Sequence, residues 1–414
     1  MTSDPQTVLK ADIIVAGAGS AGLSAAIAFA QSGFSVICAG RIPAHAPGRT
    51  VALFDGSLRF YKALGLWDRF AADVAPLEKI RLIDDTGSLF RLPPVEFSAR
   101  EIGYDAFGEN IENDVLVSGL AEAARAQPNL NLIDSLITQV TPDSNEITVT
   151  LDDGRSLSAA LLVAADGRKS IARDAAGIEV ENWPYPQSAL TVLLEHDQPH
   201  RDVSTEFHTR FGPCTLVPMV GRPGAPHRSS LVWLMPPHEA ERRMALSDAD
   251  LSAEIEKQVH CIHGPTRVVG TRGSFPMGGL KAKAFAARRI ALIAETAHVF
   301  PPIGAQGLNL SLRDIASLVE TVEDARASGR DIGGAETLAA YDKGRRADVA
   351  MRVRGVDALN RSLLANVLPV DFLRGAGLIA LANIGPLRRA LMREGVMPQG
   401  RPPRLMRDQR QKAS

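Results

Sequence analysis

Residues 11–16 read ADIIVA, residues 17–22 read GAGSAG, and residues 34–40 read FSVICAG. The first and third stretches are short, apolar and rich in β-branched side chains, which is typical of parallel strands buried on both faces. Residues 23–31 are Ala-rich and favour a helix that Gly33 can end. A strand, a glycine turn, a helix and a second strand thus follow within about 30 residues, the order found in dinucleotide-binding proteins.

The turn has the spacing GxGxxG, formed by Gly17, Gly19 and Gly22. Gly17 permits the tight turn, Gly19 lets a pyrophosphate approach the backbone, and Gly22 lets the helix pack closely on the strand. Ser20 and Ala21, between these glycines, are further expected cofactor contacts, and the helix that follows has free N–H groups and a dipole that favour an anion. The pattern predicts dinucleotide binding, and a purely structural glycine turn is the alternative.

The residue after the second strand departs from the usual pattern. Dinucleotide-binding proteins carry an acid there for the ribose hydroxyls, but this chain has Gly40, followed by Arg41. Two interpretations stay open at this point: an NADP site with Arg41 on the 2′-phosphate, or an FAD site whose ribose is held by backbone, water or Arg41.

Apolar strands of the same kind recur at residues 161–165 and 290–294. Between them, residues 183–235 contain proline, histidine and alternating stretches, which favour an antiparallel sheet outside the first core. The expected fold class is therefore α/β, with a discontinuous Rossmann-like domain, an inserted antiparallel-sheet domain and a C-terminal helical segment.

The segments that follow the late strands carry further motifs. An Asp-Gly pair stands at 166–167, and residues 295–314 read ETAHVFPPIGAQGLNLSLRD. With RTVAL at 49–53 and IEN at 111–113, the chain resembles the aromatic-ring flavin monooxygenases of the para-hydroxybenzoate hydroxylase type. The form of these motifs is most similar to the ubiquinone-biosynthesis hydroxylase branch of that family.

The resemblance implies an FAD-binding domain, a substrate domain that contains the antiparallel sheet, and a C-terminal helical region that ends in a basic tail. The expected bounds are 1–75, 100–182 and 280–335 for the first, 76–99 and 183–279 for the second, and 336–414 for the third.

The resemblance also implies cofactor-binding residues. Asp166 and Gly167 would contact the pyrophosphate and ribityl of FAD, and Glu295 a ribityl hydroxyl, although the family's usual Gly-Asp is here Ala294-Glu295. Taken singly, Asp166 and Glu295 could also be helix N-caps or first-turn acids. The remaining expected contacts come from Arg49, from Asn113 and, through its backbone, from Val140.

Residues 302–309 are expected to form a loop at the flavin edge. Gly304 and Gly307 let the backbone approach a flat ring, and the helix that begins near 307 points its N-terminus at the ring, where its dipole stabilises negative charge. The expected contacts of this loop are Pro302, Gly304, Gln306, Gly307, Leu308 and Asn309.

The implied activity is hydroxylation of an aromatic ring with FAD bound, NAD(P)H as a transient co-substrate, and O2. The expected substrate is a polyprenylated phenol of ubiquinone biosynthesis. The alternatives are a hydroxylase of soluble phenols, a flavin reductase of the same fold, and a non-catalytic flavoprotein scaffold of a quinone-biosynthesis complex. No catalytic acid or base can be assigned, His298 is interpreted as a packed histidine, and the other histidines lack metal-ligand spacing.

Charge is unevenly distributed along the 414 residues. The net charge is −1, which excludes a global field for nucleic acid. Residues 385–414 hold eight basic and two acidic residues, so that segment is +6 and the rest is −7. A solvated terminus and attraction to an anionic membrane or acidic partner are both open interpretations.

Residues 363–387 are apolar but uncharged only from 375 to 387, too short to span a bilayer. They can lie on a membrane surface, pack on the protein's own core, or contact a partner subunit. Three distant cysteines and no evident signal peptide favour the cytoplasm, with peripheral contact at the inner face of the membrane. The same apolar residues could also form the contact in a homo-oligomer or in a quinone-biosynthesis complex.

The apolar wall of the substrate site is expected in the inserted sheet, with ordinary sheet core as the alternative. The expected wall residues are Thr205, Phe207, Phe211, Pro213, Leu216, Pro218 and residues 232–235.

Overall fold

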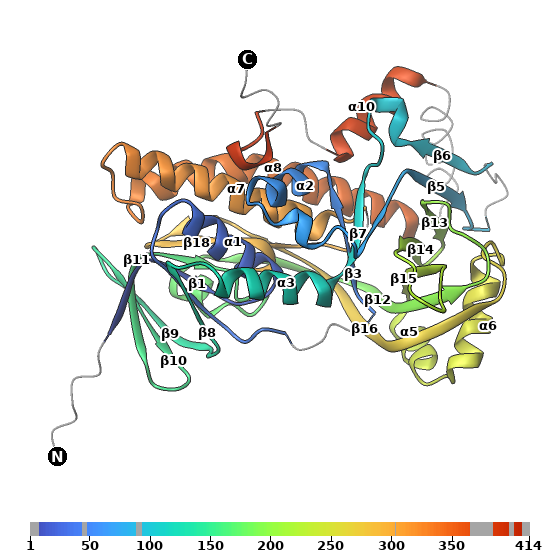
Figure 1. Cartoon of the computed structure of the whole chain (residues 1–414), viewed down its shortest axis with the longest axis horizontal. Coiled ribbons are helices and arrows are strands. Elements are labelled where there is room, and N and C mark those ends of the chain that lie inside the picture. Colours follow the sequence, from blue (N-terminus) through green and yellow to red (C-terminus); the bar gives the residue numbers. More distant parts are fainter. Residues whose placement is uncertain are drawn as a thin grey trace.

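The computed structural model describes residues 8–43, 48–87, 93–302, 304–364, 384–396 and 401–407. These residues form two eight-stranded sheets and a small three-stranded sheet, together with helices that pack on them (Figure 1).

The first sheet has the order β17-β18-β11-β1-β2-β8, with β10 paired to β11 and β9 paired to β10. Strands β18, β11, β1, β2 and β8 run parallel, so their carboxyl ends meet at one edge. Most of their apolar side chains are buried, as the sequence predicts, with Ile13, Ile14 and Val15 all 0% exposed. Helices α1, α3 and α7 pack together beside this sheet. The strands are β1 (Leu9–Ala16), β2 (Val36–Ala39), β8 (Leu130–Ile133), β9 (Ile137–Pro142), β10 (Ile147–Leu151), β11 (Ser156–Ala164), β17 (Ala286–Ala287) and β18 (Ile290–Leu292).

The second sheet has the order β19-β16-β12-β15-β14-β13-β5-β6. It is mostly antiparallel, as expected, but β13 pairs with β5 in parallel. One of its faces packs on helices α5 (Pro237–Met244) and α6 (Asp248–Gln258), around its own apolar cluster. The strands are β5 (Lys79–Asp84), β6 (Val95–Ser98), β12 (Val180–His196), β13 (Val203–Thr209), β14 (Gly212–Met219), β15 (Arg228–Met235), β16 (Thr266–Ala282) and β19 (His298–Val299).

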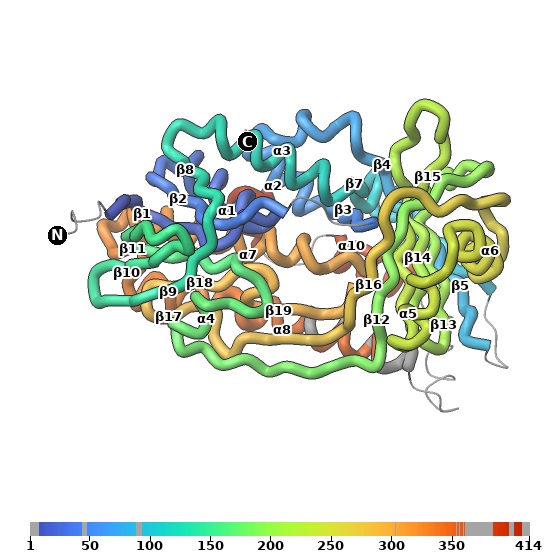
Figure 2. Tube along the Cα trace, turned by 90° about the horizontal axis from the view of Figure 1, so that it is seen from below, coloured from blue at the N-terminus to red at the C-terminus, as the bar shows by residue number. Residues whose placement is uncertain are grey.

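Two long strands connect the two sheets. β12 and β16 have 17 residues each and pair from Val180–Ala282, beside the first sheet, to His196–Thr266 at the far end of the second. Figure 2 shows the two strands running side by side along the molecule. The small sheet, β3 (Thr50–Phe54), β7 (Gly108–Glu112) and β4 (Val74–Pro76), lies between them and bonds to the second sheet, since Thr50 Oγ1 is 2.7 Å from Ser230 Oγ.

The helix predicted at 23–31 begins three residues earlier, at Ser20, and the helix predicted near 307 begins at Gln306. The remaining elements are α1 (Ser20–Gln31), α2 (Asp55–Ala63), α3 (Asn113–Arg125), α4 (Ile171–Ala175), α7 (Gln306–Ala327), α8 (Ala335–Leu364), α10 (Gly385–Val396) and the short 3-10 helices η1 (Trp67–Arg69), η2 (Ala99–Ile102), η3 (Ala294–Thr296) and η4 (Arg404–Met406).

The predicted apolar wall is in part wrong. Phe207, Leu216, Trp233 and Met235 belong to the cluster under α5 and α6, because successive residues of a strand point to opposite faces. Phe211 lies in the turn between β13 and β14 and is 54% exposed.

The basic tail is not simply solvated, which corrects one interpretation of its charge. Arg388 donates to Glu101 at 2.6 Å and lies over the ring of Phe97. Two further arginines, Arg404 and Arg407, pair with the acidic side of α7 through Glu320, Glu323 and Asp324. Arg410 and Lys412 lie outside the described residues.

Four histidines that are distant in sequence gather at the far end of the second sheet. His196 stacks on His263 at 4.4 Å between ring centroids, with His200 and His227 each at 6.3 Å. Within the described ranges, no group of three or more His, Cys, Asp or Glu is arranged to hold a metal ion, this cluster included. Burial, together with the neighbouring positive groups, lowers the pKa of His263 to about 3 and that of His196 to about 4.

We expect this cluster to make the protein less stable in acid. Below the pKa of about 6.5 that histidine has in the unfolded chain, only the unfolded state takes up the protons, so stability is lost as the pH falls from 6.5 towards 4. The loss is at most about 1.4 kcal/mol per pH unit for each histidine. Urea unfolding between pH 7.5 and 4.5 measures it, and His263→Gln should flatten the slope, whereas the exposed His238→Gln should leave it unchanged.

Candidate functional site

The carboxyl edge of the first sheet collects the segments that the sequence singled out. Ala16 pairs with Ala39 and with Ala164, and Ala164 pairs with Leu292. The residues that follow these strands therefore emerge side by side. They include Gly17–Gly22, Gly40–Arg41, Asp166–Gly167 and Ala294–Glu295.

Three glycines at this edge are required by close packing. A Cβ at Gly22 would overlap the carbonyl oxygen of Gly17, and a Cβ at Gly17 would overlap that of Ala165. A Cβ at Gly40 would lie 2.6 Å from the amide nitrogen of Ala18. Position 40 therefore has no room for the ribose-binding acid, which explains its absence.

Two other glycines have no such structural reason. A Cβ at Gly19 or Gly307 would meet no atom within 4 Å, and neither residue has a positive φ. Gly19 lies just before α1, and Gly307 lies in the first turn of α7. Neither helix has a side-chain cap at its N-terminus or an acidic residue in its first turn. Open space over uncapped N–H groups is what a pyrophosphate and an electron-rich ring edge require, so these residues fit an FAD.

Asp166 joins the end of β11 to α4 and η3. Its carboxylate accepts from Ser170 Oγ at 2.6 Å and from the amide of Ala172 at 3.2 Å, and Thr296 Oγ1 lies at 3.4 Å. The amide of Gly167 donates to the same Thr296 hydroxyl. Asp166 thus acts as a helix-capping residue in this arrangement, while its role towards FAD stays a prediction.

Glu295 is exposed and lies 3.1 Å from the guanidinium of Arg168. This pair links the two acid-bearing turns at the edge. Arg41 is held in a similar way, by Asp152 at 2.9 Å, so its guanidinium is directed to the turn between β10 and β11.

Arg49 and Asn113 meet beside the small sheet. The amide of Asn113, the first residue of α3, donates to the carbonyl oxygen of Arg49 at 3.0 Å. The Arg49 guanidinium lies 5.2 Å from the ring centroid of Phe275, in β16. Val140 pairs with Val149 in the β9–β10 hairpin and packs on the large apolar core, and its expected adenine contact stays a prediction.

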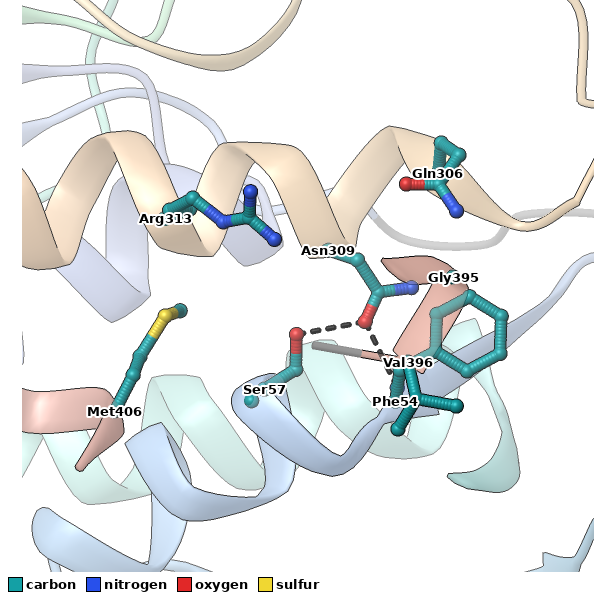
Figure 3. Close-up of a pocket in the computed structure, with 9 residues that line it drawn as sticks. Phe54, Ser57, Gln306, Asn309, Arg313, Gly395, Val396 and Met406 are labelled. Carbon is teal, nitrogen blue, oxygen red and sulfur yellow. Dashed lines mark hydrogen bonds between the residues drawn. The ribbon is translucent and has the colours of Figure 1, made fainter. Parts of the chain in front are cut away.

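Asn309 anchors the first turn of α7. Its Oδ1 accepts from the amide of Phe54 at 2.8 Å and from Ser57 Oγ at 2.7 Å (Figure 3). Its Nδ2 donates to the carbonyl oxygens of Ala52 and Ala305. The side-chain amide is therefore fully used in positioning the loop, which leaves only the backbone for a cofactor. The anchor borders a pocket lined by Phe54, Gly56, Ser57, Gln306, Asn309, Arg313, Gly395, Val396 and Met406.

The loop before α7 has the open backbone that the sequence predicts. Gly304 has φ +65 and Ala305 has φ +51, and a Cβ at Gly304 would meet no atom within 4 Å. Gln306 Nε2 donates to the carbonyl oxygen of Gly304 at 3.0 Å, which fixes the turn. Pro302 is exposed and Leu308 half-buried on either side of it.

A buried ionic network, which we call the α7–α8 network, lies behind this edge. Asp314 is 0% exposed and contacts His298 at 2.6 Å, Arg345 at 2.8 Å and the amide of Ala294 at 3.1 Å. Burial alone raises the pKa of Asp314, but His298 and Arg345 outweigh it and hold this pKa below its usual value. The carboxylate is therefore charged, and His298 is a packed, satisfied histidine as interpreted.

The α7–α8 network extends to the flavin-edge loop. Arg345 continues to Asp348 at 2.7 Å, and Arg352 joins Asp348 to Gln306, with its Nη1 2.9 Å from Gln306 Oε1. The turn that carries Glu295 and the loop that carries Gln306 are thus connected through α8. The sequence gives no signal for the roles of Asp314, Asp348 and Arg352, because acids and arginines on a helix are most often surface residues.

Ala294 occupies a strained backbone conformation. Its φ is +56, in the left-handed region that favours glycine. The resemblance drawn from the sequence implies a glycine at this position. The bond from the Ala294 amide to Asp314 holds the turn in this shape.

Replacing Ala294 with glycine is expected to stabilise the protein by about 0.5–1 kcal/mol, because the left-handed strain is removed. Ala297, three residues later, has an ordinary negative φ of −96, so Ala297→Gly should destabilise by a similar amount. Thermal unfolding of both variants measures the difference, and equal destabilisation by the two changes would contradict strain at 294.

The sequence of this chain is similar to one family model and to two ubiquinone-pathway hydroxylases. The model of the family described as FAD binding domain matches residues 10–355. The ubiquinone hydroxylase UbiL of Rhodospirillum rubrum is 32% identical over 407 residues, covering 96% of this chain and 92% of its own. The 3-demethoxyubiquinol 3-hydroxylase of Escherichia coli is 28% identical, covering 95% of this chain and 99% of its own.

Solved structures share the fold. p-Nitrophenol 4-monooxygenase PnpA of Pseudomonas putida matches with a TM-score of 0.78 at 16% identity, over 95% of this chain and all of its own. The flavin-dependent monooxygenase PieE, solved with FAD and substrate, matches with a TM-score of 0.70 at 19% identity, over 94% of this chain and 72% of its own.

Proposed function

We propose, on the premise that this chain belongs to the FAD binding domain family of flavin-dependent monooxygenases, that it hydroxylates the ring of a polyprenylated phenol in ubiquinone biosynthesis. The observation that supports FAD binding is the pair of unstrained, unobstructed glycines, Gly19 and Gly307, at two uncapped helix N-termini. The similarity to ubiquinone hydroxylases over nearly the whole chain supports the substrate class.

The residues that would hold FAD lie along one sheet edge. The α1 N-terminus would bind the pyrophosphate, Asp166 and the Arg168–Glu295 pair would flank the ribityl, and the α7 N-terminus would face the ring. When bound, FAD supplies hydride acceptance from NAD(P)H and activation of O2. The chain itself orients the ring and keeps water out, and the α7–α8 network fixes the two turns on which this depends. We also propose that the chain is divided as the sequence predicts, into an FAD-binding domain and a substrate domain.

The hydroxylase proposal is tested with purified protein, NAD(P)H, 18O2 and a polyprenylated phenol. We expect bound FAD, NAD(P)H oxidation that the phenol accelerates, and one 18O atom in the ring of the product by mass spectrometry. If the ring is reduced or unchanged, or only a soluble phenol reacts, the corresponding alternative replaces the proposal. Mass spectrometry of the quinone intermediates that accumulate without the gene then identifies the ring position.

Membrane contact forms the second part of the proposal, and its source would be α10. Met392 and Val396 are buried against β6 and η2, while Ile384, Leu387 and Leu391 are 48–52% exposed. Arg389 and Arg393 are exposed on the same helix, so an apolar stripe lies beside positive charge. No helix within the described ranges is both long enough and apolar enough to cross a bilayer. The remaining apolar residues, 365–383, lie outside the described residues.

An anionic phospholipid surface is therefore the proposed partner of α10. The wild-type protein should sediment together with vesicles of phosphatidylglycerol. The double variant Leu387→Asp with Leu391→Asp should stay in the supernatant. The matched control is Leu136→Asp, which changes a leucine that is 45% exposed elsewhere on the surface. Equal binding by all three proteins, or equal binding to neutral vesicles, would contradict a docking surface on α10.

A further inference from the structure

Asn110, in the middle strand of the small sheet, carries a buried oxygen that has no hydrogen-bond partner. Its side chain is 1% exposed, and Nδ2 donates to the carbonyl oxygen of Pro218, in β14, at 2.8 Å. A carbonyl oxygen can only accept, so this bond fixes the orientation of the amide and leaves Oδ1 as the acceptor. No donor among the described residues reaches Oδ1, and the atom is closed to solvent. Such an acceptor costs free energy, and only an O–H or N–H group can recover it.

The alternation of side chains along β7 shows which way Asn110 points. Ile111, the next residue, packs in the large apolar core, so Asn110 lies on the opposite face of the small sheet. Glu112 is two residues from Asn110, hence on the same face, and it pairs with Arg228 of β15 at 3.1 Å. Asn110 therefore points into the interface between the small sheet and the second sheet.

The small sheet meets the face of the second sheet that is turned away from α5 and α6. Ser230, which bonds to Thr50 of β3, alternates with Leu231 of the cluster under those two helices. Val217 pairs with Ser230, and Val232 is two residues further along β15, so both valines point the same way as Ser230. Both are half-buried, whereas Leu231 is 0% exposed. At these positions the face that meets the small sheet is thus the more accessible one, and its side chains are apolar.

The flavin-edge loop approaches Asn110 from the other edge of the small sheet. Ala52 of β3 pairs directly with Asn110, which places the two Cα atoms about 4.5–5.5 Å apart on the same face. Ala52 is half-buried, and its carbonyl oxygen accepts from Asn309 Nδ2, in the first turn of α7, at 2.7 Å. Asn110 is thus one strand away from the strand that anchors the candidate flavin edge. A ring that lies against Ala52 and Val217 has its polar group next to Oδ1.

We propose that Asn110 Oδ1 accepts a hydrogen bond from the ring hydroxyl of the substrate, an inference that rests on the hydroxylase function proposed above. The hydroxyl keeps its proton, because a carboxamide oxygen is a weak base. The entering ring must part the side chains that cover Oδ1, and the hydrogen bond that forms offsets this cost. A methyl ether or a quinone has no proton to donate and would set two acceptors face to face. Asn110 is therefore a specificity-determining residue that selects a ring with a free hydroxyl.

The test compares two probes that differ by one hydroxyl, 2-geranylphenol and geranylbenzene, on the FAD-loaded protein. Equilibrium dialysis gives both dissociation constants, and their ratio is the preference for the phenol. Asn110→Val should lower this preference about tenfold, the value of one hydrogen bond, because the acceptor is gone. In turnover, the KM for the phenol should rise by about the same factor, with a smaller change in kcat.

Two variants and one further probe separate this effect from damage to the interface between the sheets. Thr50→Val removes the bond to Ser230 on the same face of the small sheet and should leave the preference unchanged. Asn110→Gln keeps an acceptor, one methylene further out, and should retain part of the preference. If Asn110→Val does not fold, the wild-type protein still decides, since it should bind the methyl ether 2-geranylanisole at least about tenfold more weakly than the phenol. Equal binding of the two would contradict the inference.

The outcomes distinguish this inference from the hydroxylase function. If wild-type protein hydroxylates the phenol while Asn110→Val keeps the wild-type preference, Asn110 is structural and the inference fails alone. If the preference depends on Asn110 but no oxygen is added to the ring, the hydroxyl site stands and the hydroxylase function fails.

Discussion

Replacing Gly19 with valine is expected to weaken FAD binding by more than about 100-fold, roughly 3 kcal/mol, while the FAD-free protein stays folded. Position 19 has an extended backbone, with φ −78 and ψ −178, and open space around its Cβ, so the fold tolerates a side chain there. The side chain would occupy the volume in which the pyrophosphate must approach the α1 N-terminus. Loss of a glycine N-cap accounts for at most about 1 kcal/mol of stability.

Flavin absorbance and thermal unfolding of the same preparations measure the two effects separately. Gly22→Ala is the matched control, because its Cβ would overlap the carbonyl oxygen of Gly17 and should destabilise the fold itself. Gly307→Ala, at the second helix N-terminus, should also reduce FAD content without loss of stability. Stoichiometric FAD in Gly19→Val would overturn the assignment of the cofactor site.

Removing the buried carboxylate of Asp314 should produce the largest loss of stability, about 3–5 kcal/mol for Asp314→Ala. The change leaves the guanidinium of Arg345, which is 3% exposed, without one of its two counter-charges, and it frees His298 and the amide of Ala294. Asp348 still pairs with Arg345 but is shared with Arg313 and Arg352. The turn at 294–296 then loses its anchor, so FAD content should fall together with stability.

Urea unfolding of the FAD-free protein measures this loss without the contribution of the cofactor. Glu336→Gln serves as the control, since the side chain is 77% exposed and its pair with Arg330 should contribute less than about 1 kcal/mol. A change below about 1 kcal/mol for Asp314→Ala would contradict the central place of this carboxylate in the α7–α8 network.

The fold was largely predictable because its signals are local. The strand at 11–16, the glycine turn and the helix at 20–31 each depend on residues within a few positions of one another. The later strands at 161–164 and 290–292 carry the same apolar pattern, so their membership of the parallel sheet could be inferred.

The face of the sheet to which each strand side chain points was harder to predict. The sequence leaves Phe207 and Leu216 open to either a substrate wall or ordinary sheet core, and the structure turns them to the core under α5 and α6. Because side chains alternate along a strand, an apolar stretch predicts a strand without showing which face meets the ligand.

By itself, the sequence determined the sheet edge, the glycine turn and the flavin-edge loop. These features depend on the positions of glycines and on the spacing of apolar residues, both of which can be read from neighbouring residues. Only the tertiary structure decided the partners of the buried polar groups. Asp314 meets Arg345 across 31 residues, and Asn360 meets Gln187 across 173. Such pairs form because burial makes an unsatisfied polar group costly, and the packed chain determines which partner lies within reach.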